Sequence, residues 1–280
     1  MEASALGHEQ QLLLDQWLGH WTVRADHSWG LTDMTVLEVD SDRGMVIVKA
    51  AGPQNVHIRR EVRAHQQWTG PWLRTGKASR LVASDTDAGI LVTSYLPGRL
   101  VEGSSAQDDP DCFRQAGKLL SDLHSQYATQ DDTWGARLLA RVQRFLSQDH
   151  RMARDVVQRV EAEISSWPTG GATVVPTHGD WAPRNWLVDD AGTILPIDLG
   201  RCDLRAPEED FVRLARQDFH RDPALEVAFL DGYGQDPRDP DTWRRVNVAE
   251  AVGTAVWAHQ VGDEDFEALG HAHLARLYPD

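Results

Sequence analysis

Apolar and polar residues alternate along much of the first hundred residues, which is the pattern of strands with one buried face. A helical repeat at residues 9–20 precedes this region, and a second one at 56–68 interrupts it. The strand-like segments are 21–25, 34–39, 45–50, 80–84 and 90–95. This part of the chain is therefore predicted to form a small antiparallel sheet with one helix inserted after its third strand.

The pattern changes at Leu96, Pro97 and Gly98, where proline and glycine end the last of these strands. Beyond this point apolar residues recur at helical spacing, first at 113–125. Further helices are predicted at 136–145, 153–167, 207–218, 222–232, 240–260 and 263–278, and short strands at 173–176, 186–188 and 194–197. The chain is thus predicted to have an α+β fold, with Pro97 and Gly98 joining its two parts.

Composition indicates a folded protein and excludes several classes. Of the 280 residues, 41% are hydrophobic and 25% are charged, as is usual for soluble globular proteins. The N-terminus lacks a basic segment followed by an apolar one, and no stretch is long and apolar enough to span a membrane. We therefore expect a cytoplasmic protein with no membrane partner. Cys112 and Cys202 are too few for a disulfide framework and are expected to be reduced thiols.

The net charge of −15 argues against a nucleic-acid partner, because polyanions are bound by clustered lysine and arginine. A cationic partner or substrate fits this charge better, although acidic side chains also serve solubility alone. Lysine occurs only at Lys49, Lys77 and Lys118, so arginine supplies most of the positive charge. A lysine retained in such a chain is a candidate for a specific role.

The densest chemical signal lies in residues 177–187 and 195–201. Phosphoryl transfer needs a carboxylate to receive or orient the proton of the acceptor hydroxyl, and oxygen ligands that hold magnesium against the phosphates. Asp180, Asn185 and Asp198 supply such a set in this order. Two arginines of these segments, Arg184 and Arg201, are candidates to reach phosphate or the acidic loop, or are ion-paired surface residues.

The pattern H-x-D-x(4)-N, followed by an apolar strand and I-D-x-G, resembles the aminoglycoside phosphotransferase and choline kinase superfamily. The run from Ile197 to Arg201, with Asp210 shortly after it, is most similar to the antibiotic-phosphorylating branch. The resemblance implies a two-lobed protein-kinase-like fold. Its N-terminal nucleotide-binding lobe, residues 1–96, would hold the small antiparallel sheet with one helix, and its larger, mainly helical catalytic and substrate-binding lobe would be residues 97–280.

The resemblance also implies a reaction, in which the γ-phosphate of ATP or GTP moves to a hydroxyl of a small molecule with the help of Mg²⁺. Asp180 would be the catalytic carboxylate that orients and finally deprotonates the acceptor hydroxyl, and Asn185 and Asp198 would hold the metal ion. Lys49 would grip the donor phosphates and Glu61, twelve residues later, would pair with it. Without the resemblance, Lys49 would be read as a strand-end lysine that reaches solvent, and Glu61 as an exposed helix acid.

Nucleotide contacts are less well marked in the sequence. Main-chain atoms of Ser94 and Leu96 are expected to bind the base, by resemblance to the hinge between the lobes of the family. Ser28 is expected to meet phosphate, but its loop, residues 27–33, holds a single glycine where a phosphate-covering loop belongs. Leu199 also departs from the family, which usually has an aromatic residue there. These departures leave the subfamily open.

Acidic residues gather after the catalytic segment and near the C-terminus, where the antibiotic kinases form a pocket for polycations. We expect the acceptor to be a small cationic, hydroxyl-bearing antibiotic, either an aminoglycoside or a basic peptide, bound by a monomer or weak dimer. The candidate acceptor-binding acids are Asp203, Glu208, Glu209 and Glu264. The same acids also fit solvated helix faces. A metabolic kinase for choline, a sugar or an amino alcohol, and a nucleotide-binding pseudokinase, remain alternatives.

Overall fold

The computed structural model describes residues 6–30, 33–52 and 54–279. Contacts within the chain group these residues into two compact units. The first unit comprises residues 1–123, 178–203 and 227–234, and the second comprises 124–177, 204–226 and 235–280. The sequence-based boundary between residues 96 and 97 refers to lobes and stays a prediction.

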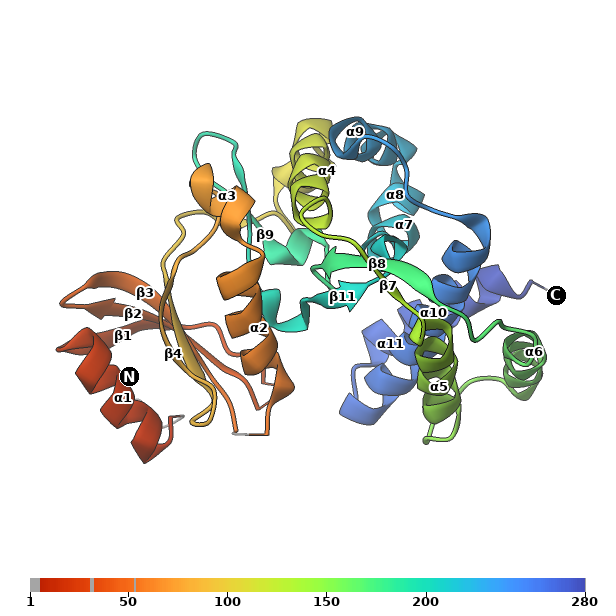
Figure 1. The fold of residues 1–280 in the computed structure, drawn as a ribbon, viewed down its shortest axis with the longest axis horizontal. Helices are drawn as coiled ribbons and strands as arrows, with labels where there is room; N and C mark the ends of the chain where they lie inside the picture. The colour runs from red at the N-terminus through yellow and green to blue at the C-terminus, as the bar shows by residue number, and fades with distance from the viewer. Residues whose placement is uncertain (1–5, 31–32, 53, 280) are drawn as a thin grey trace. The chain divides into compact units, whose positions relative to one another are not determined.

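A five-stranded antiparallel sheet forms the centre of the first unit, in the order β1-β2-β3-β5-β4 (Figure 1). All five strands were expected from the sequence. They are β1 (Trp21–Asp26), β2 (Thr35–Ser41), β3 (Gly44–Ala50), β4 (Leu81–Asp85) and β5 (Ile90–Ser94). Lys49 lies in the middle strand, β3, where it is opposite Val36 of β2 and Leu91 of β5.

One helix covers each face of this sheet. Leu14 and Leu18 of α1 (His8–Leu18) pack with one set of strand residues, which includes Val48. Ile58 and Val62 of α2 (Val56–Gln67) instead pack against Leu91, on the other face. Side chains alternate between the two faces of a strand, so Lys49 is on the face that α2 covers. The parity of one lysine in β3 thus decides that it meets α2.

Helix α2 begins at a polar cap. The side chain of Asn55 accepts a hydrogen bond of 2.8 Å from the backbone N–H of His57, which satisfies one of the free donors of the first turn. The helix then presents Glu61 to the sheet among buried neighbours. Its start and its length match the segment that the sequence indicated.

The rest of the first unit combines short elements with two helices that approach closely. Its smaller elements are α3 (Gly70–Arg74), β6 (Arg99–Leu100), β9 (Trp186–Val188) and β10 (Ile194–Pro196). Strands β10, β9 and β6 form a three-stranded sheet in this order. Helix α4 (Pro110–His124) meets the C-terminal part of α9 (Pro223–Tyr233) at Gly117, where an added Cβ would lie 2.0 Å from the carbonyl oxygen of Phe229.

Four of the longer helices of the second unit pack with a three-stranded sheet, ordered β11-β8-β7, in which Asp203 of β11 is grouped with the first unit. The strands are β7 (Thr129–Asp131), β8 (Ala172–Thr177) and β11 (Asp203–Arg205), and the helices are α5 (Trp134–Leu146), α6 (Arg154–Ile164), α10 (Pro240–Val261) and α11 (Glu264–Leu277). Among the residues that the structure describes, no helix is both long and apolar enough to cross a membrane.

The single helix expected at residues 207–218 is wrong. The segment instead consists of a 3-10 turn (Pro207–Asp210) and two short helices, α7 (Val212–Arg216) and α8 (Asp218–Arg221). Gln217 leaves the helical conformation, with φ −112° and ψ −84°. Buried polar residues on either side, Asp210 among them, are directed by their partners and not by a helical repeat.

Candidate active site

A buried lysine pairs with two acids in the first unit. The Nζ atom of Lys49 lies 2.9 Å from the Glu61 carboxylate and 2.7 Å from Oδ1 of Asp198. The Lys49 side chain is only 12% exposed, so it does not extend into solvent from the end of its strand. The sequence motifs separated by 149 residues thus meet through one ammonium group.

Electrostatics keeps this group charged. Burial alone would lower the pKa of Lys49, but the charges of Asp198 and Glu61 outweigh burial and hold the pKa above its usual value. The ammonium in turn lowers the pKa of Asp198. The structure therefore presents an ionised carboxylate beside a fixed cation, and the side chain of Asp198 remains 47% exposed.

Asp198 has an unusual backbone. Its φ of 61° and ψ of 72° place it in the left-handed region, and it is the one non-glycine residue with positive φ among those described. Such a conformation costs about 1 to 3 kcal/mol and is typical of functional positions. Two residues later, Gly200 packs closely against α2, since an added Cβ would lie 3.3 Å from Cβ of His57. Strain and close packing together direct Asp198 toward Lys49.

The loop with Asp180 is held by its own hydrogen bonds. Nδ2 of Asn185 donates to the Asp180 carbonyl oxygen at 2.8 Å, across the 3-10 turn Pro183–Asn185. Gly179 takes a φ of 80°, which glycine adopts without strain. The Asp180 side chain is 6% exposed. The backbone of the loop is thus fixed around Asp180, whose carboxylate is nearly buried.

Two hydrogen bonds join this loop to the segment of Asp198. The ring nitrogen Nε2 of His178 lies 3.0 Å from the carbonyl oxygen of Ile197. The backbone N–H of Ile197 donates to the carbonyl oxygen of Asn185, also at 3.0 Å. His178 is fully buried, and this hydrogen bond braces the loop. These bonds bring Asn185 and Asp198, the two expected metal ligands, onto neighbouring segments of one unit.

Aromatic packing behind the loop was not anticipated. The Trp181 ring, next to Asp180 in the sequence, stacks on Trp72 with 6.0 Å between centroids and lies 5.4 Å from Trp186. Phe113 of α4 meets Trp186 edge to face at 5.5 Å. The sequence signal for this packing was the pair of tryptophans at positions 181 and 186, which lie on either side of Asn185.

Arginine is the main neighbour of Asp180. Nη2 of Arg184 donates to both carboxylate oxygens of Asp180, at 2.8 and 2.7 Å. Nε of Arg201 lies 4.0 Å from the same carboxylate. Burial works against the charge of Arg184, yet Asp180 outweighs it and raises the pKa of the guanidinium. The sequence left open whether these arginines reach phosphate or the acidic loop, or form ion pairs at the surface. In the structure both lie within ion-pair distance of Asp180 in the acidic loop.

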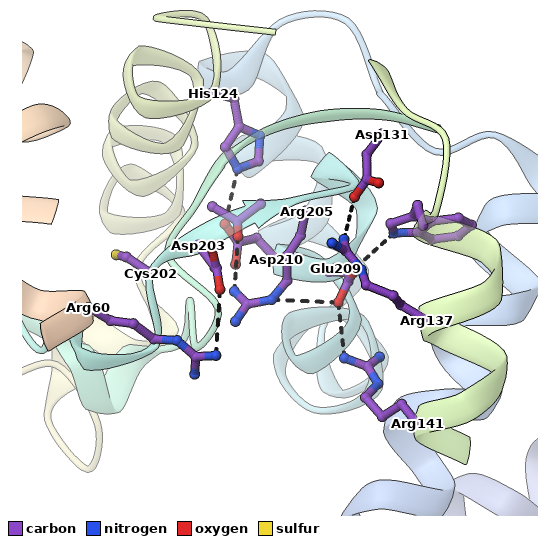
Figure 2. Close-up of polar contacts among 12 residues, drawn as sticks. Arg60, His124, Asp131, Arg137, Arg141, Cys202, Asp203, Arg205, Glu209 and Asp210 are labelled. Carbon is purple, nitrogen blue, oxygen red and sulfur yellow. Dashed lines mark hydrogen bonds and ion pairs between the residues drawn. The ribbon is translucent and has the colours of Figure 1, made fainter. Parts of the chain in front are cut away.

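The expected acceptor-binding acids occupy different settings. Asp203, in the first unit, lies 2.7 Å from Nη2 of Arg63 and 3.5 Å from Arg60. Glu209, in the second unit, lies 3.3 Å from Arg141 and 4.0 Å from Arg205, and accepts a hydrogen bond from Trp134 (Figure 2). The sequence pattern indicated these acids but not the arginines that compensate them.

The other two acids differ from this pattern. Glu208 is 5% exposed, its pKa is raised by burial, and Oε1 accepts from the backbone N–H of Asp239 at 3.4 Å. Glu264 is exposed at the first turn of α11. The role of all four acids in binding an acceptor stays a prediction.

Three residues were expected from the sequence to contact a nucleotide. The backbone N–H of Ser94 donates to the carbonyl oxygen of Arg80 at 2.9 Å, and Leu96 is half-buried just after β5. The Ser28 hydroxyl accepts from the N–H of Val36 at 3.0 Å, but part of its loop, residues 31–32, lies outside the described residues. Contacts of Ser28, Ser94 and Leu96 with a nucleotide stay predictions.

The donor atoms of Asn185 and Asp198 fit magnesium. Mg²⁺ prefers oxygen ligands and is usually bound by one or two protein groups together with phosphates and waters. An amide oxygen and an ionised carboxylate on hydrogen-bonded neighbouring segments provide this set. No group of three histidine, cysteine or acidic residues that would suit a metal ion occurs among the described residues.

Comparison with known proteins agrees with this geometry. The model of the phosphotransferase enzyme family matches residues 27–247, which include Lys49, Glu61, Asp180, Asn185 and Asp198. The chain belongs to the phosphotransferase enzyme family. The expected superfamily and its protein-kinase-like α+β fold are thereby confirmed. A search of curated proteins finds no match to this sequence.

The solved structures that share the fold of this phosphotransferase belong to proteins with different activities. Choline kinase LicA from Streptococcus pneumoniae is 14% identical with a TM-score of 0.67, and 97% of this chain covers 99% of that one. Aminoglycoside phosphotransferase APH(4)-Ia is 9% identical with a TM-score of 0.72, at 99% and 98% coverage. Spectinomycin phosphotransferase APH(9)-Ia, in complex with ADP and spectinomycin, is 14% identical with a TM-score of 0.62, at 97% and 94%. At these identities the likeness shows the fold alone.

Proposed function

We propose that the protein transfers the γ-phosphate of ATP or GTP to a hydroxyl of a small cationic molecule. One observation supports this proposal above the others. In a single compact unit, Lys49 holds both Glu61 and Asp198, and the segment of Asp198 is hydrogen-bonded to the loop of Asp180 and Asn185. A structural role explains one buried ion pair, but it does not explain a left-handed, half-exposed aspartate as its partner.

The residues divide the work of an in-line displacement. The acceptor oxygen forms a bond to the γ-phosphorus while the bond from that phosphorus to the β–γ bridging oxygen breaks, and the electron pair leaves with the nucleoside diphosphate. Asp180 accepts a hydrogen bond from the acceptor hydroxyl and finally takes its proton. Lys49, fixed by Glu61, neutralises phosphate charge. Asn185 and Asp198 would hold Mg²⁺, which neutralises charge on the phosphates when bound.

The acceptor is proposed to be a cationic antibiotic, an aminoglycoside or a basic peptide, and the enzyme to confer resistance. The net charge of −15 favours a cation. Arginines compensate Asp203 and Glu209, so among the four candidate acids the exposed Glu264 is the best placed to attract positive charge. A metabolic acceptor is the second candidate, supported by the fold shared with a choline kinase. Both acceptors would use the same catalytic residues.

The test is a screen for nucleoside diphosphate release from ATP and GTP with aminoglycosides, basic peptide antibiotics, choline, sugars and amino alcohols. Mass detection of a phosphate adduct identifies the acceptor, and growth protection of a susceptible bacterium tests resistance. Replacing Asp180 by alanine is expected to lower turnover about 1,000-fold. Asp122→Ala is a matched control, because it removes an acid whose partner, Lys118, lies on the surface of α4. Equal activity of Asp180→Ala and the control would exclude the assignment.

A further inference from the structure

The catalytic loop contains one basic side chain between its acid and its amide. Positions 181, 182 and 183 are tryptophan, alanine and proline, so Arg184 alone supplies positive charge between Asp180 and Asn185. Its guanidinium extends back across this short turn and binds the carboxylate of Asp180. The side chain of Asp180 is 6% exposed. The side chain of Arg184 itself is 33% exposed, so a ligand approaching the loop can contact it.

The proposed reaction brings phosphate within reach of this guanidinium. The acceptor oxygen must lie about 3 Å from the Asp180 carboxylate, and the γ-phosphorus about 3 to 3.5 Å from that oxygen. The phosphoryl group therefore lies within about 6 to 7 Å of Asp180, close to where Arg184 already ends, 2.7 Å from Oδ2. An arginine with four rotatable side-chain bonds spans such a shift without movement of the backbone.

The transferred group would gain from a cation in addition to Lys49 and the proposed Mg²⁺. Lys49 is held by two carboxylates, Glu61 and Asp198, which together exceed its single charge. In the transition state negative charge spreads over the three equatorial oxygens of the transferred group. A guanidinium can bind two such oxygens at once, in the geometry it also uses for carboxylates.

We infer that Arg184 binds the transferred phosphoryl group, exchanging one or both bonds to Asp180 for bonds to phosphoryl oxygens as the acceptor hydroxyl arrives. The inference rests on the proposed function, because it assigns a further catalytic residue to that reaction. Before binding, the guanidinium occupies both oxygens of the catalytic acid. After binding, the hydroxyl takes its place on Asp180 and the arginine stabilises the charge that develops on phosphorus-bound oxygen.

The experiment compares the full chain with Arg184→Gln and Arg184→Lys. Titration calorimetry measures the affinity for Mg-ADP alone and for Mg-ADP with aluminium fluoride, a mimic of the transferred group, and GDP is tested in parallel. In the unchanged chain, the fluoride complex is expected to bind more tightly than ADP. Arg184→Gln should lose at least about tenfold of this preference while the Kd for Mg-ADP changes less than about twofold. The kcat for nucleotide turnover should fall about 100-fold and recover in part in Arg184→Lys.

Two further variants separate binding of phosphate from structure and from positioning of Asp180. Arg159→Gln removes an arginine of another i, i+4 pair, 3.2 Å from Asp155, and should change neither affinity. In an Asp180→Asn background, Arg184→Gln should still weaken the fluoride complex. If it no longer does so, Arg184 acts only through Asp180 and the inference is overturned.

The remaining outcomes are distinct for the two proposals. If the unchanged chain binds Mg-ADP, prefers the fluoride complex and turns over nucleotide, but Arg184→Gln keeps the preference, the inference alone fails. Equal weakening of both affinities, with a lowered unfolding midpoint, would assign Arg184 to structure and also overturn it. If the unchanged chain binds neither ADP nor GDP, or shows no preference for the fluoride complex, the proposed function fails and the inference with it.

Discussion

Ion pairs in the two compact units are built from the same residue types but differ in what they leave open. In the second unit, Glu163 accepts two hydrogen bonds from Arg244 and one of 2.7 Å from the hydroxyl of Tyr278. Its carboxylate ties α6 to α10 and to the end of α11, and only 22% of the side chain is exposed. In the first unit, Asp198 meets Lys49 through one oxygen and is 47% exposed on a strained backbone. The first arrangement favours stability, and the second keeps a charged group available for ligand.

Replacing Asp198 by asparagine should have the largest effect of the changes that test this contrast. The amide tolerates the left-handed backbone but removes the charge that would hold a metal ion. Nucleotide turnover should fall about 1,000-fold, equivalent to about 4 kcal/mol in the activation barrier. The free energy of unfolding should change by less than about 1 kcal/mol, because the exposed carboxylate contributes little net stability.

Turnover and urea unfolding of this variant are measured on the same preparation. An Asp198→Asn chain that unfolds far more easily than the unchanged chain would show that its ion pair is structural, like that of Glu163. The contrast between the units would then be lost.

Replacing Glu163 by alanine should have the opposite outcome. It leaves Arg244 and the Tyr278 hydroxyl without their common acceptor, so the free energy of unfolding should fall by about 3 kcal/mol. Tyr278→Phe, which removes only the bond at 2.7 Å, should cost about 1 kcal/mol. Well below the unfolding midpoint, nucleotide turnover of both variants should stay within about twofold of the unchanged chain. A large loss of turnover without a loss of stability would contradict the division.

Each unit also buries a histidine that resists protonation, so pH should affect both. Burial lowers the pKa of His65 to about 4, with the charge of Lys49 adding to it, and burial with Arg216 and Arg276 does the same for His273. The unfolded chain binds these protons near pH 6.5, so stability is complete above that pH and falls as the pH drops toward 4. Each histidine should account for up to about 3 kcal/mol over this window.

Urea unfolding between pH 7.5 and 4.5 measures this loss. Leucine at position 65 or 273 removes one titrating group and should flatten the profile by about half of the histidine contribution, whichever unit it lies in. Profiles of the two variants that match that of the unchanged chain would show that other groups cause the acid sensitivity.

The sequence predicted those parts of the molecule that follow from periodicity and motif spacing. The contact between Lys49 and Glu61 followed from the resemblance to the family and not from periodicity, and the structure places the two side chains 2.9 Å apart. The five strands of the larger sheet were found because each is long enough to show alternation. Three short strands, Arg99–Leu100, Thr129–Asp131 and Asp203–Arg205, and the five-residue helix Gly70–Arg74 show no such pattern and were missed.

Partners of charged side chains were the least predictable feature. Glu209 and Arg141 are 68 residues apart, and Asp203 and Arg63 are 140 apart, so no local pattern connects them. The same limit explains the error at residues 207–218, where buried polar groups interrupt the helix. Arg184 differs, because it lies four residues from Asp180 within one turn, and the sequence made it a candidate to reach the loop or phosphate, with a surface ion pair as the alternative.

The smallest effect should come from Glu209→Gln, which tests whether compensated acids bind the acceptor. Arg141 and Arg205 already balance this carboxylate (Figure 2), so a cationic acceptor gains little from it. In Glu209→Gln, the KM for such an acceptor should rise less than about threefold. Glu264→Gln removes an exposed acid and should raise the KM by about the same factor, but this rise should disappear at high salt. A tenfold or greater rise for Glu209→Gln would mean that the acceptor displaces the arginines. Glu209 would then behave as Asp180 does in our inference, where an arginine is ion-paired with the carboxylate until the ligand replaces it.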